Sequence, residues 1–147
     1  MSQPTRLLLL VACFSATSLA RADVVADARA YVDKGLQAYV ASGPKAFLEY
    51  TVKGGALEGN PQTLSQANTL QQIQDIGGKP TAYEIVSTTK LSERSVELLY
   101  VVYLEKAAVF GTALIYRTPD GGLTTQLFNF NTLPDKVWPQ ARVYGAP

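Results

Sequence analysis

YLEKAAVFGTALIYRTPDGGLTTQLFNFNT, residues 103–132, carries the most regular strand and turn signals of this chain. Aromatic and β-branched residues alternate with other residues along most of it, which is the period of half-buried β-strands. Pro119-Asp120-Gly121 interrupts the alternation with the chemistry of a three-residue hairpin, because its glycine tolerates a positive φ. The stretch therefore predicts two antiparallel neighbours, a strand over residues 108–118 and a strand over residues 123–131.

The segment before this hairpin predicts two more strands, over residues 83–89 and 95–105. A two-residue turn at Lys106-Ala107 joins the second of them to the strand that begins at Ala108. Because successive strands connected by short turns pair with their neighbours in order, we expect a four-stranded antiparallel meander.

The N-terminal half of the chain predicts three helices. Apolar residues recur at spacings of three and four over residues 23–42, and Gly43-Pro44 ends that helix and begins a short second one. Asn60 is a suitable N-cap for a third helix with Pro61 at its first position, and Gly77-Gly78 ends it. The apolar stripe of this third helix consists of Leu64, Ala67, Leu70, Ile73 and Ile76. Helices followed by strands predict an α+β fold, in which three N-terminal helices pack on one face of a curved sheet.

The start of the chain has the features of a secretory signal peptide. Arg6 supplies a positive charge, residues 7–14 form a short apolar run, and Ala20-Arg21-Ala22 places small residues at a cleavage site. The apolar run is too short for a membrane span. We therefore predict a signal peptide over residues 1–22, a single α+β domain over residues 23–147, and a periplasmic or secreted protein that has no membrane attachment after cleavage.

An alternative within the export interpretation is a lipoprotein anchored at Cys13, which follows Leu10-Val11-Ala12. Only six apolar residues would precede that cysteine, fewer than the apolar core of a signal peptide requires. The pattern therefore favours a cleaved signal peptide over a lipid anchor.

The composition excludes several chemistries. Cys13 is the only cysteine and histidine is absent, so a domain over residues 23–147 has no disulfide, no cysteine nucleophile, no Ser–His or Cys–His pair and no zinc site of nitrogen or sulfur ligands. We predict no metal and no cofactor. Arg6 and Arg21 are two of the 13 basic residues, and their loss with the signal peptide leaves 11 against 12 acidic ones. This balance argues against nucleic acid as a partner.

Counting across the two predicted turns assigns the residues of the sheet to two faces, to within one residue of register. The face turned toward the helices collects Val96, Leu98, Tyr100, Val102 and Leu104, then Val109, Gly111, Ala113 and Ile115, then Thr125, Leu127, Asn129 and Asn131. Gly111 and Ala113 are small and lie beneath larger neighbours, which predicts a hollow. Either a helix presses into it, which is the commoner outcome, or a pocket remains with Tyr100, Asn129 and Asn131 near its rim. The two asparagines have a plain alternative role as partners of loop backbone groups.

The opposite face of the predicted sheet is strongly aromatic. It collects Leu99, Val101, Tyr103, Phe110, Leu114, Tyr116, Phe128 and Phe130, with Glu97, Glu105 and Gln126 among them. Such a face is too apolar to be exposed only to solvent, and two alternatives could cover it. A second copy of the chain would bury it in a two-fold homodimer. Alternatively, the C-terminal segment folds back over it with Val137, Trp138 and Tyr144.

Three segments, GGKPTAYEIV, YVVYLEKAAVFGTALIYRTPDGG and LFNFNTLPDKVWP, resemble the nuclear transport factor 2-like (NTF2-like), cystatin-like α+β superfamily, and within it small exported bacterial proteins of unassigned function. The resemblance covers most of residues 23–140, and Tyr116-Arg117 and Phe128-Asn129-Phe130-Asn131 are its most specific part. It implies a cone-shaped fold with a pocket beneath the helices, and frequent dimerisation through the outer face of the sheet. Enzymes of the superfamily carry Asp, Tyr or His in the cone. Without histidine, the histidine-based dehydratase chemistry does not carry over to this chain.

The predicted function is that of an exported, non-enzymatic domain that binds a small apolar molecule or a protein partner. The predicted ligand contacts are Tyr100, Gly111, Ala113, Tyr116, Arg117, Asn129 and Asn131, with no catalytic and no metal-binding residue. Arg117 either pairs with a ligand carboxylate or is a solvated residue at a strand end. The alternative function is a cofactor-free isomerase, lyase or hydrolase that uses a carboxylate or tyrosine in the cone, with Glu84 or Asp75 as candidate carboxylates.

Overall fold

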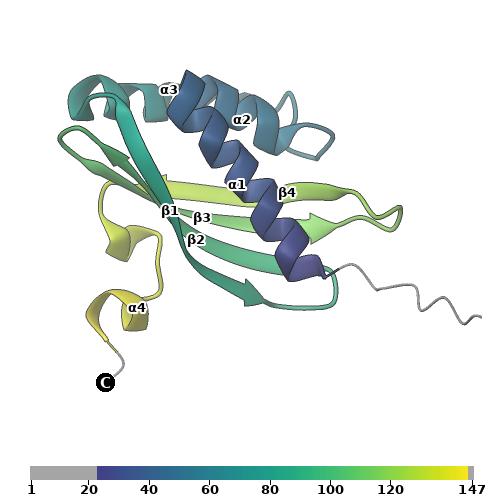
Figure 1. Cartoon of the computed structure of the whole chain (residues 1–147). Helices are drawn as coiled ribbons and strands as arrows, with labels where there is room; N and C mark the ends of the chain where they lie inside the picture. The colour runs from purple at the N-terminus through teal and green to yellow at the C-terminus, as the bar shows by residue number, and fades with distance from the viewer. Residues whose placement is uncertain (1–22, 146–147) are drawn as a thin grey trace, which may run out of the picture.

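The computed structural model of the chain describes residues 23–145, and three helices at its start lie on one face of a sheet (Figure 1). They are α1 (Val24–Ser42), α2 (Pro44–Val52) and α3 (Pro61–Gly77). The predicted signal peptide and the alternative lipid attachment at Cys13 lie outside the described residues. Within the described part, no helix combines the length and the apolar character needed to cross a membrane.

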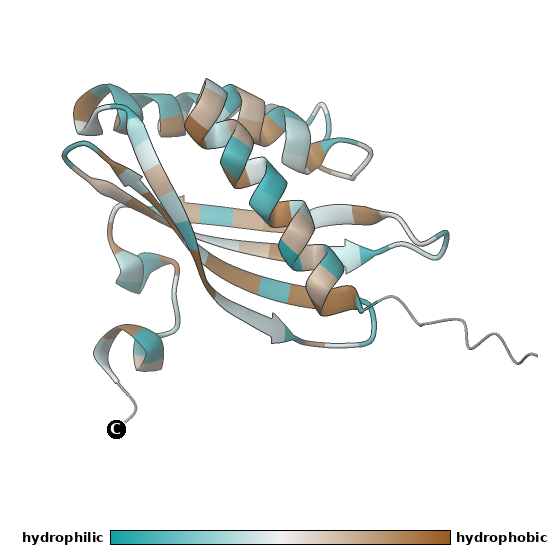
Figure 2. Cartoon of the chain, viewed as in Figure 1, coloured by the Kyte–Doolittle hydropathy of each residue, from teal (hydrophilic) through white to brown (hydrophobic). Residues whose placement is uncertain are grey.

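Local hydrogen bonds and glycines fix the ends of these helices where the sequence predicts them. The Asp23 side chain accepts a hydrogen bond from Val25 N at the start of α1, and the Asn60 side chain accepts one from Gln62 N, at 2.8 Å, at the start of α3. Gly43 has a φ of 86°, which lets the chain pass directly from α1 into α2. The helix α1 carries both apolar and polar residues (Figure 2), and its apolar side packs against the sheet.

The sheet consists of β1 (Pro80–Lys90), β2 (Ser95–Leu104), β3 (Ala108–Arg117) and β4 (Leu123–Asn131). The strands lie side by side in chain order, and each pairs antiparallel with the next. Gly121 adopts a φ of 91° in the turn before β4, as the turn chemistry requires. The predicted α+β class, with three helices on a four-stranded antiparallel meander, is confirmed. A short 3-10 helix η1 (Pro134–Lys136) and the short helix α4 (Gln140–Tyr144) follow the sheet.

The core lies between α1, α2 and the inner face of the sheet. Tyr100 pairs with Gly111 and Leu98 with Ala113, so the predicted faces of β2 and β3 are correct. The buried residues of these two strands that belong to the core are Val96, Leu98, Tyr100, Val102, Leu104, Val109, Ala113 and Ile115. The helices cover them with Ala28, Val32, Leu36, Tyr39, Phe47 and Leu48.

A β-bulge in β4 reverses the predicted faces of that strand. Leu114 pairs with Leu127 and the next residue, Ile115, pairs with Thr125, so Gln126 is an extra residue without a cross-strand partner. Beyond it, Phe128 and Phe130 turn toward the helices and join the core. The remaining residues of this stretch, Leu127, Asn129 and Asn131, lie on the outer face. The prediction was therefore wrong for residues 127–131, because one inserted residue moves every later side chain to the opposite face.

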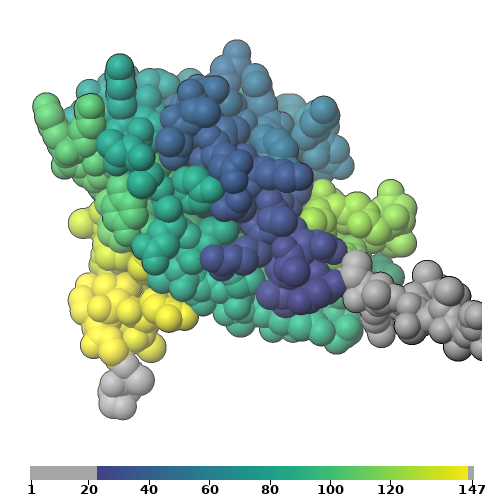
Figure 3. All heavy atoms as spheres, in the orientation of Figure 1, coloured from purple at the N-terminus to yellow at the C-terminus, as the bar shows by residue number. Residues whose placement is uncertain are grey.

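The C-terminal segment packs beside the strands (yellow in Figure 3), and two hydrogen bonds place it on the outer face of the sheet. Thr112 Oγ1 donates to the carbonyl oxygen of Val137 at 2.8 Å, and Trp138 Nε1 donates to the carbonyl oxygen of Gly111 at 3.0 Å. The Trp138 ring packs edge-on against Phe110, with centroids 5.1 Å apart. The predicted cover by Val137 and Trp138 is confirmed. Tyr144 takes no part in it, since 72% of its surface is exposed.

Candidate functional site

The hollow predicted beneath the helices is occupied by an aromatic ring of the sheet itself. Gly111 faces the helical layer as predicted, and a Cβ atom built on it would lie 2.1 Å from Cζ of Tyr100. Tyr100 is 2% exposed, and Phe47 of α2 packs over it with ring centroids 6.2 Å apart. Phe128 closes the same space from β4, 6.3 Å from Phe47. The small residue at position 111 thus makes room for Tyr100.

Two tyrosine hydroxyls lie within this aromatic interior. Burial raises the pKa of Tyr39 to about 12. Burial, and secondarily the neighbouring Tyr39, raises the pKa of Tyr100 far above its ordinary value. The Tyr39 hydroxyl has no hydrogen-bond partner among the described residues. Both groups are therefore neutral phenols near neutral pH, which makes them unsuitable as general bases.

The structure does not bring the seven predicted ligand contacts together. Tyr100, Gly111 and Ala113 are neighbours in the interior. Tyr116 pairs with Thr124 on the outer face, where Asn129 and Asn131 also lie. Their binding role stays a prediction, but a single cavity lined by all of them is not present.

Three of these polar residues have local structural partners. Arg117 forms an ion pair with Asp27 of α1, and its side chain is only 18% exposed. Asn129 Oδ1 accepts from Phe130 N at 2.9 Å, and Asn131 Oδ1 accepts from Leu133 N at 3.0 Å. Arg117 is thus neither a solvated strand end nor a free guanidinium, and the two asparagines satisfy backbone groups, which was their plain alternative.

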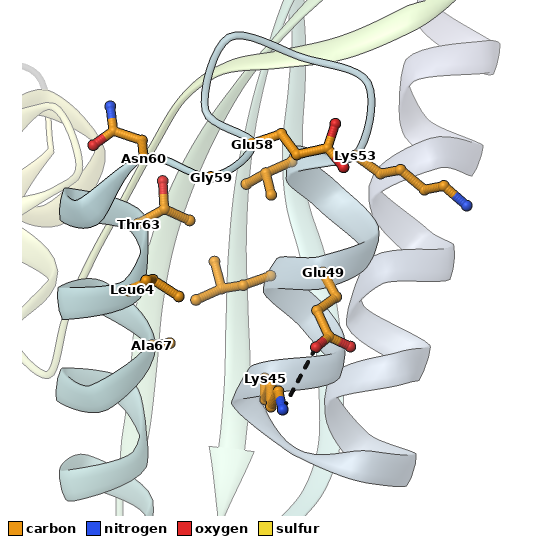
Figure 4. A pocket seen from close by; sticks show the side chains of 11 residues that line it. Lys45, Glu49, Lys53, Glu58, Gly59, Asn60, Thr63, Leu64 and Ala67 are labelled. Atoms are coloured by element: carbon orange, nitrogen blue, oxygen red, sulfur yellow. Dashed lines mark ion pairs between the residues drawn. The ribbon is translucent and has the colours of Figure 1, made fainter.

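A cleft between α2 and α3 is a better candidate for a binding site. Its walls are apolar: Leu48 and Val52 come from α2, and Leu64 and Ala67 come from α3 (Figure 4). The cleft has a volume of about 260 Å³. Leu64 is 65% exposed, although the sequence places it in the buried stripe of α3.

The polar residues around this cleft form its rim. Lys45 Nζ lies 3.8 Å from Glu49 Oε1, and both side chains are exposed. At the other end Glu58 accepts a hydrogen bond from Gly54 N at 2.8 Å, which holds the loop between α2 and α3. Charges of both signs surround an apolar floor, so the cleft suits an apolar group and does not select strongly for either sign of charge.

The cleft exists because α3 contacts the rest of the molecule along a narrow line. Of its 17 residues only Thr63, Leu70 and Gly77 are buried, and Thr63 Oγ1 donates to the Leu57 carbonyl oxygen at 3.0 Å. Of the other stripe residues, Ala67 and Ile73 are partly buried against the core, whereas Leu64 and Ile76 are exposed. The sequence shows the apolar stripe of α3 through its periodicity. Periodicity does not show that the stripe extends beyond the surface with which α3 packs, so it does not predict the cleft.

Comparison with known proteins finds a weak structural similarity and does not identify a function. No family model matches the sequence, and no curated protein matches it. The chain is similar to the crystal structure of an NTF-2-like protein of unknown function from Silicibacter pomeroyi, with 13% identity, a TM-score of 0.46, and coverage of 72% of this chain and 98% of that one. The chain's own elements, three helices followed by four antiparallel strands, have the arrangement expected of an NTF2-like fold.

Proposed function

We propose that the protein is an exported binding protein that takes up a small, mainly apolar molecule in the cleft between α2 and α3. The observation that carries the proposal is the exposure of Leu64 at the wall of a cleft whose other walls, Leu48 and Val52, are buried. Full burial of a leucine side chain stabilises by about 1.5–3 kcal/mol, so a ligand that covers Leu64 gains a large part of that free energy. Export rests on the sequence of residues 1–22.

The alternative function, a cofactor-free isomerase, lyase or hydrolase, would need a carboxylate or a tyrosine in an enclosed cavity. Glu84 and Asp75 are both exposed, where Glu84 accepts from Tyr103 Oη at 3.2 Å and Asp75 accepts from Gln71 Nε2 at 2.8 Å. The buried tyrosines lie in a packed interior. These positions favour binding over catalysis.

Fluorescence titration with N-phenyl-1-naphthylamine, a neutral apolar probe, tests this proposal. We expect saturable binding by the wild-type protein and its loss in Leu64→Glu. Ile76→Glu is the matched control, because Ile76 also lies on α3, is 83% exposed and does not line the cleft. Equal binding by wild type and Leu64→Glu, or equal loss in both variants, would overturn the proposal.

A further inference from the structure

A second hollow, of about 220 Å³, lies on the other side of the start of α3, between that helix and β4. It shares Asn60 and Thr63 with the apolar cleft but differs from it in chemistry. Its distinctive residues are three glutamines, Gln62, Gln66 and Gln126, and three apolar residues, Leu57, Leu127 and Phe128. None of the residues that line this hollow is ionisable.

Two features of the fold bring the three amides together. Gln62 and Gln66 are four residues apart on α3, so they lie on the same side of the helix. Gln126 is the extra residue of the bulge in β4, and a bulge redirects the side chain of the residue that it inserts. The same bulge turns Phe128 toward the core, and Phe128 is also one of the residues that line the hollow.

The three side-chain amides are unused within the described part of the chain. None of them donates or accepts a hydrogen bond with another residue in 23–145, whereas Gln37 and Gln71 each donate to an aspartate four residues away. Each amide offers two donors and one acceptor. A charged ligand would lose hydration here without meeting an opposite charge, so the hollow selects an uncharged one.

We propose that this hollow binds the secondary amide of an uncharged ligand, such as an N-acetylated sugar or a peptide unit. A secondary amide presents one hydrogen-bond donor and one acceptor. The side-chain amide of a glutamine can accept from that donor with its oxygen and donate to that acceptor with its NH₂ group. The methyl or side-chain carbon beside such an amide packs against Leu57 and Leu127, and Leu127 is 49% exposed. Although Thr63 lines both hollows, the amides of this one, Gln62 and Gln66, do not line the apolar cleft, so the two sites can be separated by substitution.

Titration of the ¹⁵N-labelled protein followed by NMR tests this directly, since side-chain amides give their own signals. The probes are N-acetylglucosamine, N-acetylalanine methylamide and glucose. We expect the side-chain signals of Gln66 and Gln126 to shift with one or both of the amide-bearing probes and not with glucose; the probe that saturates first identifies a sugar or a peptide as the source. No shift with any probe, or an equal shift with glucose, would overturn the proposal.

Variants separate this site from the apolar cleft. Gln66→Ala and Gln126→Ala should each weaken binding of the amide probe about fivefold, the effect of one lost hydrogen bond. Gln72→Ala, an exposed amide on the same helix that lines neither hollow, should change it less than twofold. Leu64→Glu should leave it unchanged even where it abolishes uptake of the apolar probe. Equal weakening by Gln72→Ala and Gln66→Ala would contradict the assignment, and the wild-type titration decides the case if a variant does not fold.

Discussion

The ring of Tyr100 lies directly against Gly111 of the neighbouring strand, while the carbonyl oxygen of Gly111 accepts a hydrogen bond from Trp138 on the other face of the sheet. One residue without a side chain therefore connects the packed interior with the C-terminal segment. The pair explains why the strand carries small residues where the sequence suggests a pocket: the space is used by a cross-strand aromatic ring.

The Tyr100–Gly111 contact predicts strong coupling between the two positions. Gly111→Ala should destabilise the protein by about 1–3 kcal/mol, because the added methyl group overlaps the Tyr100 ring. The same change in a Tyr100→Ala background should cost less than about 0.5 kcal/mol, since the obstructing ring is gone. Urea denaturation followed by circular dichroism measures all four proteins. Strictly additive costs would show that the two residues do not share one space.

The buried tyrosines predict a loss of stability at alkaline pH. The pKa of Tyr39 is raised to about 12 in the folded protein from about 10 in the unfolded chain, so its contribution is fully present below pH 10 and is lost as pH rises toward 12. Tyr100 acts in the same direction. Absorbance at 295 nm should show these two tyrosines ionising well above pH 10 in the folded protein and near pH 10 once urea has unfolded the chain.

The unpaired hydroxyl of Tyr39 predicts an unusual response to its removal. Tyr39→Phe should be neutral or stabilising by up to about 1 kcal/mol at neutral pH, because it deletes a buried polar atom that has no partner among the described residues. Tyr31→Phe is the contrasting variant, since the Tyr31 hydroxyl donates to the Thr51 carbonyl oxygen at 2.8 Å and its loss should cost about 1 kcal/mol. Thermal unfolding compares them; a large destabilisation by Tyr39→Phe would indicate that its hydroxyl does have a partner.

Because the C-terminal segment covers part of the outer face of the sheet, we expect removal of this segment to increase self-association through that face. Truncation after Leu133 removes Trp138 from Phe110 and uncovers apolar residues of the sheet. Sedimentation velocity should then show more self-association than in the full chain. Truncation after Tyr144 is the control, because the few residues beyond it follow an exposed tyrosine. Equal sedimentation of the full chain and the protein truncated after Leu133 would mean that the segment does not protect this face.

The signal-peptide prediction specifies the mature N-terminus. Protein recovered from the periplasm or the medium should begin at Asp23, which is also the N-cap of α1. Cys13→Ala should leave processing and location unchanged, whereas a lipoprotein would lose its anchor. Mass spectrometry of the purified protein distinguishes these outcomes, and a cytoplasmic protein that retains Met1 would contradict export.

The sequence predicts much of the fold because its signals are local. Asn60 and Pro61 start a helix, Gly77-Gly78 ends it, and the period of two places Gly111 on the inner face. The bulge escapes prediction because Gln126 is neither glycine nor proline, and the run after it alternates equally well in either register. The filled interior depends on the side-chain direction of Tyr100, which no periodicity specifies.

The candidate site was the less predictable part for a related reason. Leu64 and Ala67 belong to the apolar stripe that the sequence predicts for α3. Whether other residues bury them depends on the distance between α3 and its neighbours. That distance follows from the whole packing of the helices. The sequence places Gln126 on the outer face of the sheet and gives no signal that connects it with Gln62 and Gln66 of α3, which it meets at the second hollow through the bulge.

Native mass spectrometry of protein purified from its exported compartment tests uptake into the apolar cleft most directly. We expect a wild-type mass that exceeds the chain mass by one small molecule, released on denaturation, and no excess mass for Leu64→Glu purified in the same way. Identical masses for the wild type and Leu64→Glu, whether both carry a molecule or both are bare, would contradict it.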